Sequence, residues 1–498
     1  MINSSVIKIL RTFDQDELRK FRDFIISPYH NKKSGAVTLF DGLKSFAPQF
    51  NDPGLDRKKI WKVIFPDAEF NYGKMKNIIY DLTRLAERFL IAEGSVSNEL
   101  MNEHILVTAY MDRNLVDLAE SLFSNFEKNS KKISFEKNTV RENYFYSLWK
   151  MHTSKWSFKN QLMHSKEYDD VIGLSSDNFL ACFFIHAFIM FHNIEAQIIE
   201  HNHIAGKSSL EKFLLKAHSS GMINEVIKSV NPLSDETGKV LTVYYKMFIT
   251  VHSNNSVESY LEYKKAISEN ISLFSKRDLL ALYITLLNCI VYLDTKKISK
   301  PEESLGIYEI MFNNKLFFLD KDNMWDQDFL SYVTLACNLG RPDLIEKFIR
   351  NVTALIREDK RENMILFAKA HLYFTKGEYG KSLECISKTN TDLFQMKYYI
   401  KNLQIRNFYE LNDYVSFLLA KDSYNHFLDK NKNVNIRWKK AMKSLCSNVS
   451  QMFKLKEKFN SFEFLKLRDK ILSSQTNKSN WIGRKISEFE NIHNIKNL

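Results

Sequence analysis

The histidines are the first residues to test for chemistry, because several lie close together in the chain. His186 and His192 are six residues apart in a predicted helix, so they point in different directions. His201 and His203 follow at the end of that helix, beside Glu200. A metal site needs three converging ligands, and these residues do not supply them. The negative end of a helix dipole accounts for histidines at such a position, so we expect no metal.

Patterns for nucleophilic catalysis and phosphate binding are also missing from the sequence. It contains no GxSxG, no GxxxxGK[ST] and no GxGxxG. Acidic pairs such as Asp169-Asp170 and Glu302-Glu303 diverge around a helix and are typical of solvated surface. We therefore expect a non-enzymatic protein without a cofactor.

Basic residues are concentrated at the end of the chain. Residues 431–498 hold 15 Lys or Arg against five acids, which gives most of the formal net charge of +12. Such a segment can follow a nucleic-acid backbone or an acidic partner. It can also be a final amphipathic helix pair that caps a repeat array with a polar outer face, and we favour the cap. The aromatic and aliphatic residues between the charges are Phe453, Phe459, Phe462, Phe464, Leu465 and Leu467.

A second basic segment, residues 58–88, could form a helix-turn-helix with Lys74 and Lys76 at the start of its second helix. The bend from Pro66 to Asn71 is longer than the usual three or four residues. Acidic residues nearby would also face phosphates, so DNA reading is the weaker interpretation.

Composition indicates long helices with short connections. The chain has 498 residues, with only 14 Gly and 7 Pro, and 44% of it is hydrophobic. Its five scattered cysteines predict reduced thiols, and with a polar amino terminus they favour a cytoplasmic protein. The most apolar run, residues 179–191, is too short to span a membrane and is interpreted as a buried helix.

The elements that must position any site are helix hairpins. In residues 362–390, Leu366, Ala370 and Tyr373 share one helical face, and Gly377 allows the left-handed corner that ends the helix. Such a short amphipathic pair must stack on similar pairs. A second helix follows, with Tyr379, Leu383 and Ile386 as its apolar stripe and the small Ser382 beside it.

The hairpin pattern recurs along the chain. Asn412 takes the place of Gly377 in the next unit, with Phe408, Tyr414 and Leu418 in equivalent positions, and Gly340 marks a preceding corner. The Tyr373–Tyr379 segment with Ser382 resembles the tetratricopeptide repeat superfamily, whose members stack helix hairpins of about 34 residues. Fainter copies have corners at Asn114, with Ala119 and Phe123, and at Asn255, where bulky Tyr260 replaces the small residue.

Residues 1–95 form a predicted N-terminal helical module. Asp14 can cap a first helix that carries Leu18, Phe21, Phe24 and Ile25. The module also resembles the leading region of a family of uncharacterised bacterial proteins, which implies no activity. The residues that carry this resemblance are Thr12-Phe13, Glu17-Leu18, Ser27-Pro28-Tyr29, Asn31-Lys32, Ile64-Phe65-Pro66 and Asn71-Tyr72.

The resemblance to the repeat superfamily implies a concave groove lined by first-helix residues. On that face lie Phe367, His371 and Phe374, followed by Tyr399, Asn402, Arg406 and Tyr409. Aromatic residues and arginine are enriched at binding hot spots. We expect the two phenylalanines to pack against a neighbouring helix, and His371, Asn402 and Arg406 to face an exposed groove. The candidate partner-binding residues are His371, Tyr399, Asn402, Arg406 and Tyr409.

The sequence therefore predicts an all-α protein: a degenerate, right-handed α-solenoid of helix hairpins over residues 96–430, preceded by the module 1–95 and closed by a basic helical cap, 431–498. The predicted function is a non-enzymatic scaffold that binds a peptide or protein segment in the groove, without a membrane. A nucleic-acid-associated regulatory protein that uses the N-terminal module or the basic tail is the alternative.

Overall fold

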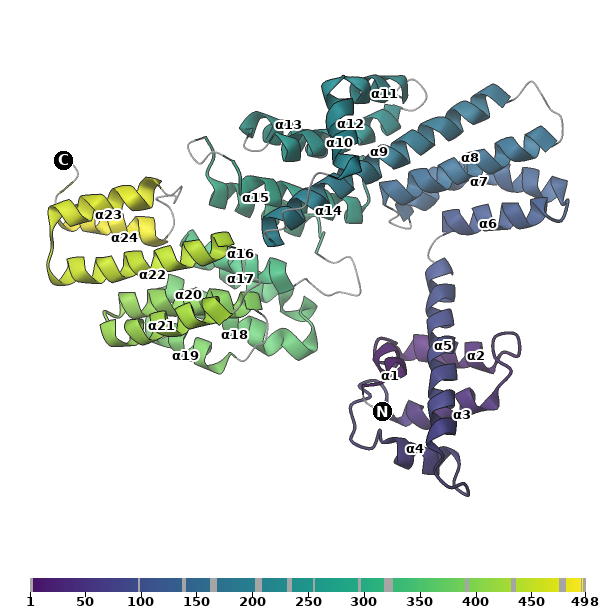
Figure 1. Cartoon of the computed structure of the whole chain (residues 1–498), viewed down its shortest axis with the longest axis horizontal. Coiled ribbons are helices and arrows are strands. Elements are labelled where there is room, and N and C mark those ends of the chain that lie inside the picture. Colours follow the sequence, from purple (N-terminus) through teal and green to yellow (C-terminus); the bar gives the residue numbers. More distant parts are fainter. Residues whose placement is uncertain are drawn as a thin grey trace. The chain divides into compact units, whose positions relative to one another are not determined.

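The computed structural model describes residues 3–96, 99–136, 140–161, 168–201, 208–230, 235–253, 256–293, 297–317, 326–389, 394–430, 436–473, 481–493 and 495. These residues are helical with short connections, and none of them forms a β-strand. The all-α class is confirmed. The chain divides into two compact units, Met1–Ile133 and Ser134–Leu498, and each is described by itself (Figure 1).

The first unit has one hydrophobic core, built from residues between Val6 and Phe89. Aromatic rings dominate its centre: Phe21 contacts both Phe40 and Phe89 at centroid distances of 5.1 and 5.3 Å. The helices of this unit are α1 (Ser5–Leu10), α2 (Gln15–Ile26), α3 (Ser34–Leu43), the 3₁₀ turn η1 (Lys44–Phe46), α4 (Arg57–Ile64), α5 (Tyr72–Val96), α6 (Glu99–Met111) and α7 (Val116–Glu136), whose last residues extend past the unit.

Local signals fix where the helices of this unit begin. The carboxylate of Asp14 accepts the Glu17 backbone N–H at 2.8 Å, while the Glu17 carboxylate accepts the Asp14 N–H at 2.9 Å. The N-cap predicted at Asp14 is confirmed, and the reciprocal bond from Glu17 makes it a capping box. Asp56 caps α4 in a similar way, through the backbone N–H groups of Lys58 and Lys59. The core ends at Phe89, before the predicted module boundary at 95, whereas the compact unit continues through α6 and α7.

The second unit is a succession of helices in which neighbours in sequence pack together. Its helices begin with α8 (Arg141–Gln161), α9 (Tyr168–His201), α10 (Ser209–Ser219), α11 (Met222–Val230), α12 (Asp235–His252), α13 (Val257–Glu269), η3 (Ile271–Leu273) and α14 (Lys276–Ile290). They continue with α15 (Lys300–Asn313), α16 (Asp326–Asn338), α17 (Pro342–Val352), η4 (Thr353–Leu355), α18 (Glu358–Thr375), α19 (Tyr379–Lys388), α20 (Phe394–Glu410), α21 (Tyr414–Lys430), α22 (Ile436–Glu457), α23 (Ser461–Ser473) and α24 (Trp481–Ile492).

The apolar run at residues 179–191 belongs to α9, a much longer helix than the run itself. By length and composition alone its segment Asp170–Gln197 could cross a membrane, a test that core helices of soluble proteins also pass. Phe184, Phe188 and Phe191 are buried, and α9 packs against α8 and α12. Phe179, Phe183 and Met190 of the same run are exposed, so the expected buried helix is confirmed for one face only.

The predicted corners adopt the left-handed backbone conformation. The φ values are +80° at Gly377, +57° at Asn412, +70° at Gly340 and +56° at Asn114. Each corner also carries the same pair of Schellman hydrogen bonds; at Gly377, its own N–H donates to the Phe374 carbonyl at 3.0 Å and the next N–H reaches back to Tyr373 at 2.8 Å. The corner predicted at Asn255 lies outside the described residues.

A fifth corner of this kind was not predicted. Lys315 has φ +53°, and its N–H and that of Leu316 donate to the carbonyls of Phe312 and Met311 at 3.0 and 2.9 Å. The corner escaped prediction because lysine, unlike glycine or asparagine, does not favour a left-handed conformation.

Ser382 joins three helices rather than only allowing two to approach. Its side chain is fully buried, and its hydroxyl donates to the Ala370 carbonyl of α18 at 2.8 Å. The amide of Asn407 on α20, also fully buried, donates to the same hydroxyl at 3.0 Å. A small polar residue at this position therefore fixes the spacing of α18, α19 and α20.

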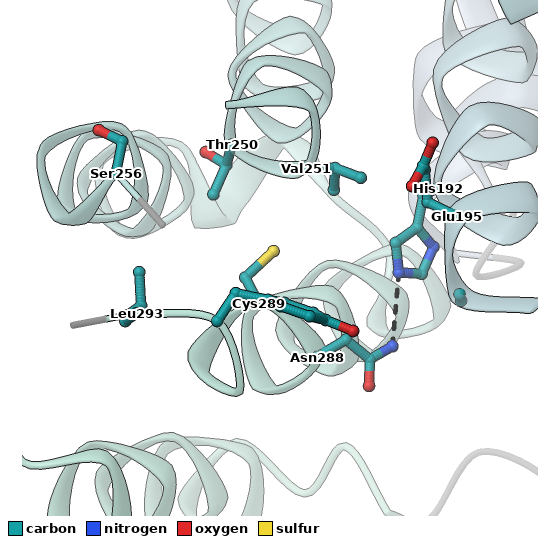
Figure 2. Close-up of a pocket in the computed structure, with 10 residues that line it drawn as sticks. His192, Glu195, Thr250, Val251, Ser256, Asn288, Cys289 and Leu293 are labelled. Carbon is teal, nitrogen blue, oxygen red and sulfur yellow. Dashed lines mark hydrogen bonds between the residues drawn. The ribbon is translucent and has the colours of Figure 1, made fainter. Parts of the chain in front are cut away.

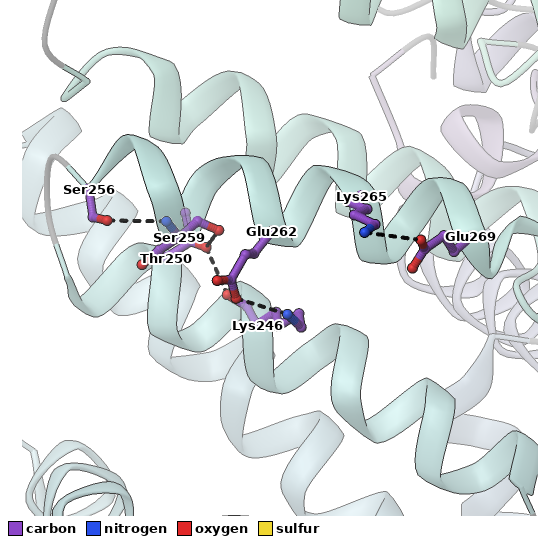
Figure 3. A network of polar contacts seen from close by, with 7 residues as sticks. All are labelled: Lys246, Thr250, Ser256, Ser259, Glu262, Lys265 and Glu269. Carbon is purple, nitrogen blue, oxygen red and sulfur yellow. Dashed lines mark hydrogen bonds and ion pairs between the residues drawn. The ribbon is translucent and has the colours of Figure 1, made fainter. Parts of the chain in front are cut away.

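In the earlier hairpin, the position equivalent to Ser382 holds a bulky residue that makes a different hydrogen bond. Tyr260 on α13 is fully buried, and its hydroxyl donates to the carboxylate of Glu303 on α15 at 2.8 Å. Polar contacts hold α12 against α13 (Figure 3): the Thr250 hydroxyl donates to the Ser259 carbonyl at 3.0 Å, and Lys246 pairs with Glu262 at 2.9 Å. This hairpin is joined by polar side chains around a bulky ring.

The basic C-terminal segment folds into α22, α23 and α24 (Figure 1). Its apolar residues Phe453, Phe464 and Leu467 are buried, as expected of packed helices, but Phe462 is 71% exposed. Several cations are used internally: Lys485 pairs with Glu410 of α20 at 2.9 Å, and Lys456 donates to the Tyr409 carbonyl at 3.2 Å. Part of the positive charge therefore serves packing.

Candidate functional site

The predicted groove residues divide into a buried set and a cavity-lining set. His371 is 3% exposed and Tyr409 is 2% exposed, so neither faces an open groove. The exposed position expected of His371 is wrong. Its Nδ1–H donates to the Phe367 carbonyl at 2.9 Å, and burial lowers the pKa of its imidazole to about 4. Tyr409 packs between Phe453 and Trp481, with ring centroids 5.2 and 5.5 Å away.

The reason lies in the neighbours of α18. This helix contacts α16, α17, α19 and α20, so both its faces are covered. Phe367 and Phe374 are 0% and 5% exposed, which confirms that they pack against neighbouring helices. Tyr399 on α20 is half-buried, with its ring 6.3 Å from Phe367, and burial raises the pKa of its hydroxyl.

Asn402 and Arg406 come together at a cavity of about 460 Å³. They lie one helical turn apart on α20, as their spacing predicted. The remaining wall comes from helices far away in sequence, since Asn338 ends α16, Asn448 lies on α22 and Trp481 begins α24. No pattern around these three residues singled them out. Other residues of the cavity wall are Tyr398, Lys440, Ala441, Met442, Ser444, Leu445 and Ile482.

Arg406 is the central charged group of this cavity. Although the residue keeps some exposed surface, its Nε atom is buried and has no hydrogen-bond partner among the described residues. One Nη donates to the Asn338 side-chain oxygen at 2.6 Å, and the guanidinium lies 5.6 Å from the centroid of Trp481. Burial lowers the pKa of the guanidinium, and the nearby cation Arg484 lowers it further.

A second cavity, of about 500 Å³, lies between α21 and α22. Its wall contains Lys421, Lys443 and Lys454, but also the carboxylate of Asp429. Asp429 pairs with Lys443 at 3.2 Å, and Lys421 donates to the Ser450 hydroxyl at 3.3 Å. Two of its three lysines already have partners inside the cavity, so it is the weaker candidate.

A third, small pocket lies between α9, α12 and α14 (Figure 2). His192 and Cys289 both line it, which is a combination that could serve nucleophilic catalysis. Its volume of about 30 Å³ admits about one water molecule. Burial also raises the pKa of the Cys289 thiol to about 12 and lowers that of His192. The thiol is therefore a poor nucleophile in a space too small for a substrate.

The most deeply buried carboxylate, Asp278 at the start of α14, is satisfied structurally. It accepts the Arg141 backbone N–H at 3.1 Å, the Ser275 hydroxyl at 2.7 Å and the Tyr244 hydroxyl at 3.0 Å. Burial raises the pKa of Asp278, and these hydrogen bonds oppose the rise. Because none of the cavities described above reaches it, this cluster ties α8, α12 and α14 together rather than performing chemistry.

The remaining candidates for metal or nucleic-acid chemistry are occupied by local contacts. In the described part of the chain, no group of three His, Cys, Asp or Glu side chains could hold a metal ion. His186 pairs with Glu142 at 2.6 Å, and His203 lies outside the described residues. In the first unit, Lys74, which the less favoured helix-turn-helix interpretation placed at the start of a recognition helix, lies over the Phe65 ring at 4.8 Å.

Comparisons of the chain with protein-family models, with curated proteins and with solved structures found no match.

Proposed function

We propose that this protein is a non-enzymatic interaction scaffold that binds a protein or peptide segment at the cavity between α20, α22 and α24. The observation that supports it is the convergence of Asn402 and Arg406, both expected in a binding groove, on one cavity of about 460 Å³. That volume lies within the range of pockets that hold ligands. Arginine is also among the residue types that dominate binding energy at interfaces.

The arrangement of helices in this half of the chain supports a repeat array. The first helices of successive hairpins contact one another, α16 with α18, α18 with α20 and α20 with α22. Such nearest-neighbour stacking is what a solenoid of helix hairpins requires. We propose the right-handed, tetratricopeptide-like arrangement on this basis, with α22–α24 as its cap. The five cysteines are free thiols, which suits a reducing, cytoplasmic location.

A selection with random-sequence peptides tests the binding function. Peptides displayed on phage and enriched on the full-length chain should lose binding at least about tenfold when Arg406→Glu reverses the charge at the cavity. Asn402→Leu should weaken the same peptides, whereas Arg350→Glu, at an exposed arginine of α17, should not. Failure to enrich any peptide, or equal binding by Arg406→Glu, would contradict the proposal.

A separate measurement addresses nucleic acid. Binding of duplex and single-stranded oligonucleotides is measured between low and moderate salt. For an interaction scaffold we expect little retention and a salt slope near zero. A steep negative slope, lost when the exposed Lys74 and Lys76 are replaced by Glu or when α22–α24 is neutralised, would favour the nucleic-acid-associated alternative.

A further inference from the structure

One face of α9 carries a stripe of exposed apolar side chains, which we call the α9 stripe: Ile172, Phe179, Phe183 and Met190. These residues are 45%, 45%, 36% and 37% exposed. Successive members are 7, 4 and 7 residues apart, so at about 100° per residue they follow one line over about five helical turns. The segment Asp170–Gln197 is apolar enough to cross a membrane, yet only 33% of its most apolar window is buried. Because so apolar a helix is normally covered by its neighbours, the stripe is a candidate contact surface.

Aromatic rings of the neighbouring helices extend this surface. Trp149 of α8 lies 5.0 Å from Phe179 between ring centroids, and Tyr146 lies 5.6 Å from Trp149. Phe213 of α10 is 41% exposed, and its ring centroid is 5.8 Å from that of Phe183. The rings therefore form one continuous surface across three helices, in which each ring is partly covered by the next.

Lysines border the aromatic surface. The Lys150 ammonium lies 5.3 Å from the centroid of the Trp149 ring. Lys212 directly precedes Phe213 on α10, and Lys216 follows one helical turn later; both are exposed. None of these three lysines forms an ion pair with another described residue. Their charges therefore remain available to an acidic partner.

The carboxylates closest in sequence to these side chains are engaged or lie on other faces. Glu142 pairs with His186 at 2.6 Å, and Glu211 is 4% exposed and caps α10. Asp170 and Asp177 lie about 140–160° around α9 from the stripe. The surface is thus apolar at its centre and positive at its rim, which complements an apolar stripe bordered by acidic residues.

We propose that the α9 stripe and the rings around it bind an amphipathic helix of a partner protein. The apolar side of that helix packs on Phe179 and Phe183, and acidic residues at its edges face Lys150, Lys212 and Lys216. Recognition of this kind uses apolar anchors at i, i+3 or i+4, and i+7 of the bound helix, and aromatic rings are enriched among the residues that dominate binding. The inference goes beyond the proposed function, because this surface shares no residue with the cavity at Arg406.

A lipid surface fits these observations less well. Side chains that insert into a membrane must reach the boundary between headgroups and acyl chains, whereas the rings of the stripe are less than half exposed and contact one another. The ion pair of Glu142 with His186 also lies near the stripe, one helical turn from Phe183, where insertion would carry it into the lipid.

A peptide library of fixed apolar pattern tests the proposal. Helical peptides of about 18 residues carry leucine along one face at i, i+3, i+4 and i+7, and the positions at the edges of that face vary among Glu, Gln and Lys. After selection on the full-length chain by phage display, we expect Glu to be enriched over Lys at the edges. The best peptide, labelled with fluorescein, should bind at least about tenfold more tightly than its Lys-for-Glu counterpart in anisotropy titrations. No enrichment, enrichment of Lys, or equal affinity of the two peptides would overturn the proposal.

Paired substitutions at exposed positions locate the site. Phe179→Ser with Phe183→Ser should weaken the acidic peptide at least about tenfold. Lys212→Glu with Lys216→Glu should weaken it and tighten the Lys-rich counterpart. If circular dichroism shows that the phenylalanine variant does not fold, the lysine variant decides, because its changes lie at exposed positions.

The matched control removes two exposed apolar side chains elsewhere. Val415→Ser with Leu419→Ser, at positions of α21 that are 71% and 68% exposed, should bind as the wild type does. Unchanged binding by the phenylalanine variant, or loss in Arg406→Glu instead, would overturn the proposal, and the second result would assign the peptide to the cavity. Co-sedimentation with phosphatidylserine vesicles that the phenylalanine variant loses, without peptide binding, would assign the surface to a membrane and overturn it as well.

Discussion

Two arginines of the second unit are surrounded by different chemistry: Arg141, which is buried, and Arg406, which keeps some exposed surface. Arg141 is 5% exposed and lies beside Asp278, whose negative charge offsets part of the lowering of its pKa by burial. Its Nε–H donates to the Leu273 carbonyl. Arg406 has Asn338 and an indole ring, and the nearby charge is another arginine. No cavity that we describe lies at Arg141, whereas Arg406 lines one of about 460 Å³.

The difference between the two arginines is how far their surroundings compensate for the loss of hydration on burial. Folding can bury a cation when a nearby carboxylate and satisfied hydrogen bonds compensate for the lost hydration. Around Asp278 that compensation is substantial though partial, since the carboxylate accepts several hydrogen bonds, and the cluster contributes to the packing of three helices. Around Arg406 the printed contacts are a neutral amide and an indole ring rather than a carboxylate, and a cavity of about 460 Å³ lies beside it. Burial of a charged side chain alone therefore does not identify a candidate binding site. The charged and polar groups around that side chain must be compared as well.

The largest expected effect comes from breaking the balanced cluster. Arg141→Met removes the cation near the buried Asp278 and the Nε–H that the Leu273 carbonyl accepts, and leaving such groups unsatisfied beside a buried charge costs about 3 kcal/mol or more. The free energy of unfolding, measured by denaturant titration at neutral pH, should fall by roughly that amount. A loss below about 1 kcal/mol would show that the hydrogen bonds to Asp278 suffice without the cation.

His371, which lies close to Arg406, gives the second effect. Its pKa in the folded protein is about 4, below the ordinary value of 6.5, because of burial and then the charge of Arg406. The folded state therefore resists protonation, and its stability should decline as the pH falls from about 6.5 to 4, by on the order of 2 kcal/mol. His371→Leu should flatten this part of the stability profile. Arg406→Met should narrow the pH range over which stability declines, because removal of the cation raises the pKa of His371.

The third effect comes from backbone strain at a helix corner, and its expected size is about 1 kcal/mol. Lys315 occupies a left-handed corner with φ +53°, a conformation that glycine adopts without strain. Lys315→Gly should raise the free energy of unfolding by about 1 kcal/mol, because the strain that it relieves exceeds the chain stiffness that it loses. Asn412→Gly, at a corner where asparagine already tolerates positive φ, should change it by only a few tenths. Equal effects at the two corners would contradict this account.

The smallest expected change in stability is at Arg406 itself. Replacing a buried charge that lacks a carboxylate partner by an apolar side chain is often neutral or stabilising. Arg406→Met should therefore change the free energy of unfolding by no more than about 1 kcal/mol without ligand, in contrast to Arg141→Met. A loss as large as that of Arg141→Met would show that Arg406 is structural and would remove the distinction between the two residues.

Much of the local structure followed from the sequence. Asp14 predicted the N-cap of α2, and the corners at Gly340, Gly377 and Asn412 followed from the few residue types that tolerate positive φ. The corner at Lys315 did not, because there the surrounding packing holds a residue against its own preference. Helical spacing also placed Asn402 and Arg406 on one face.

What only the tertiary structure decided is which faces remain open and which groups remain unpaired. His371 has the same helical spacing as an exposed groove residue, yet helices on both sides of α18 bury it. The cavity wall brings Asn338, Asn448 and Trp481 to Arg406 from three other helices. Periodicity determines the face of one helix, because it depends on neighbouring residues along the chain. Burial and missing counter-charges depend on residues tens of positions away, so the sequence pattern alone could not reveal them.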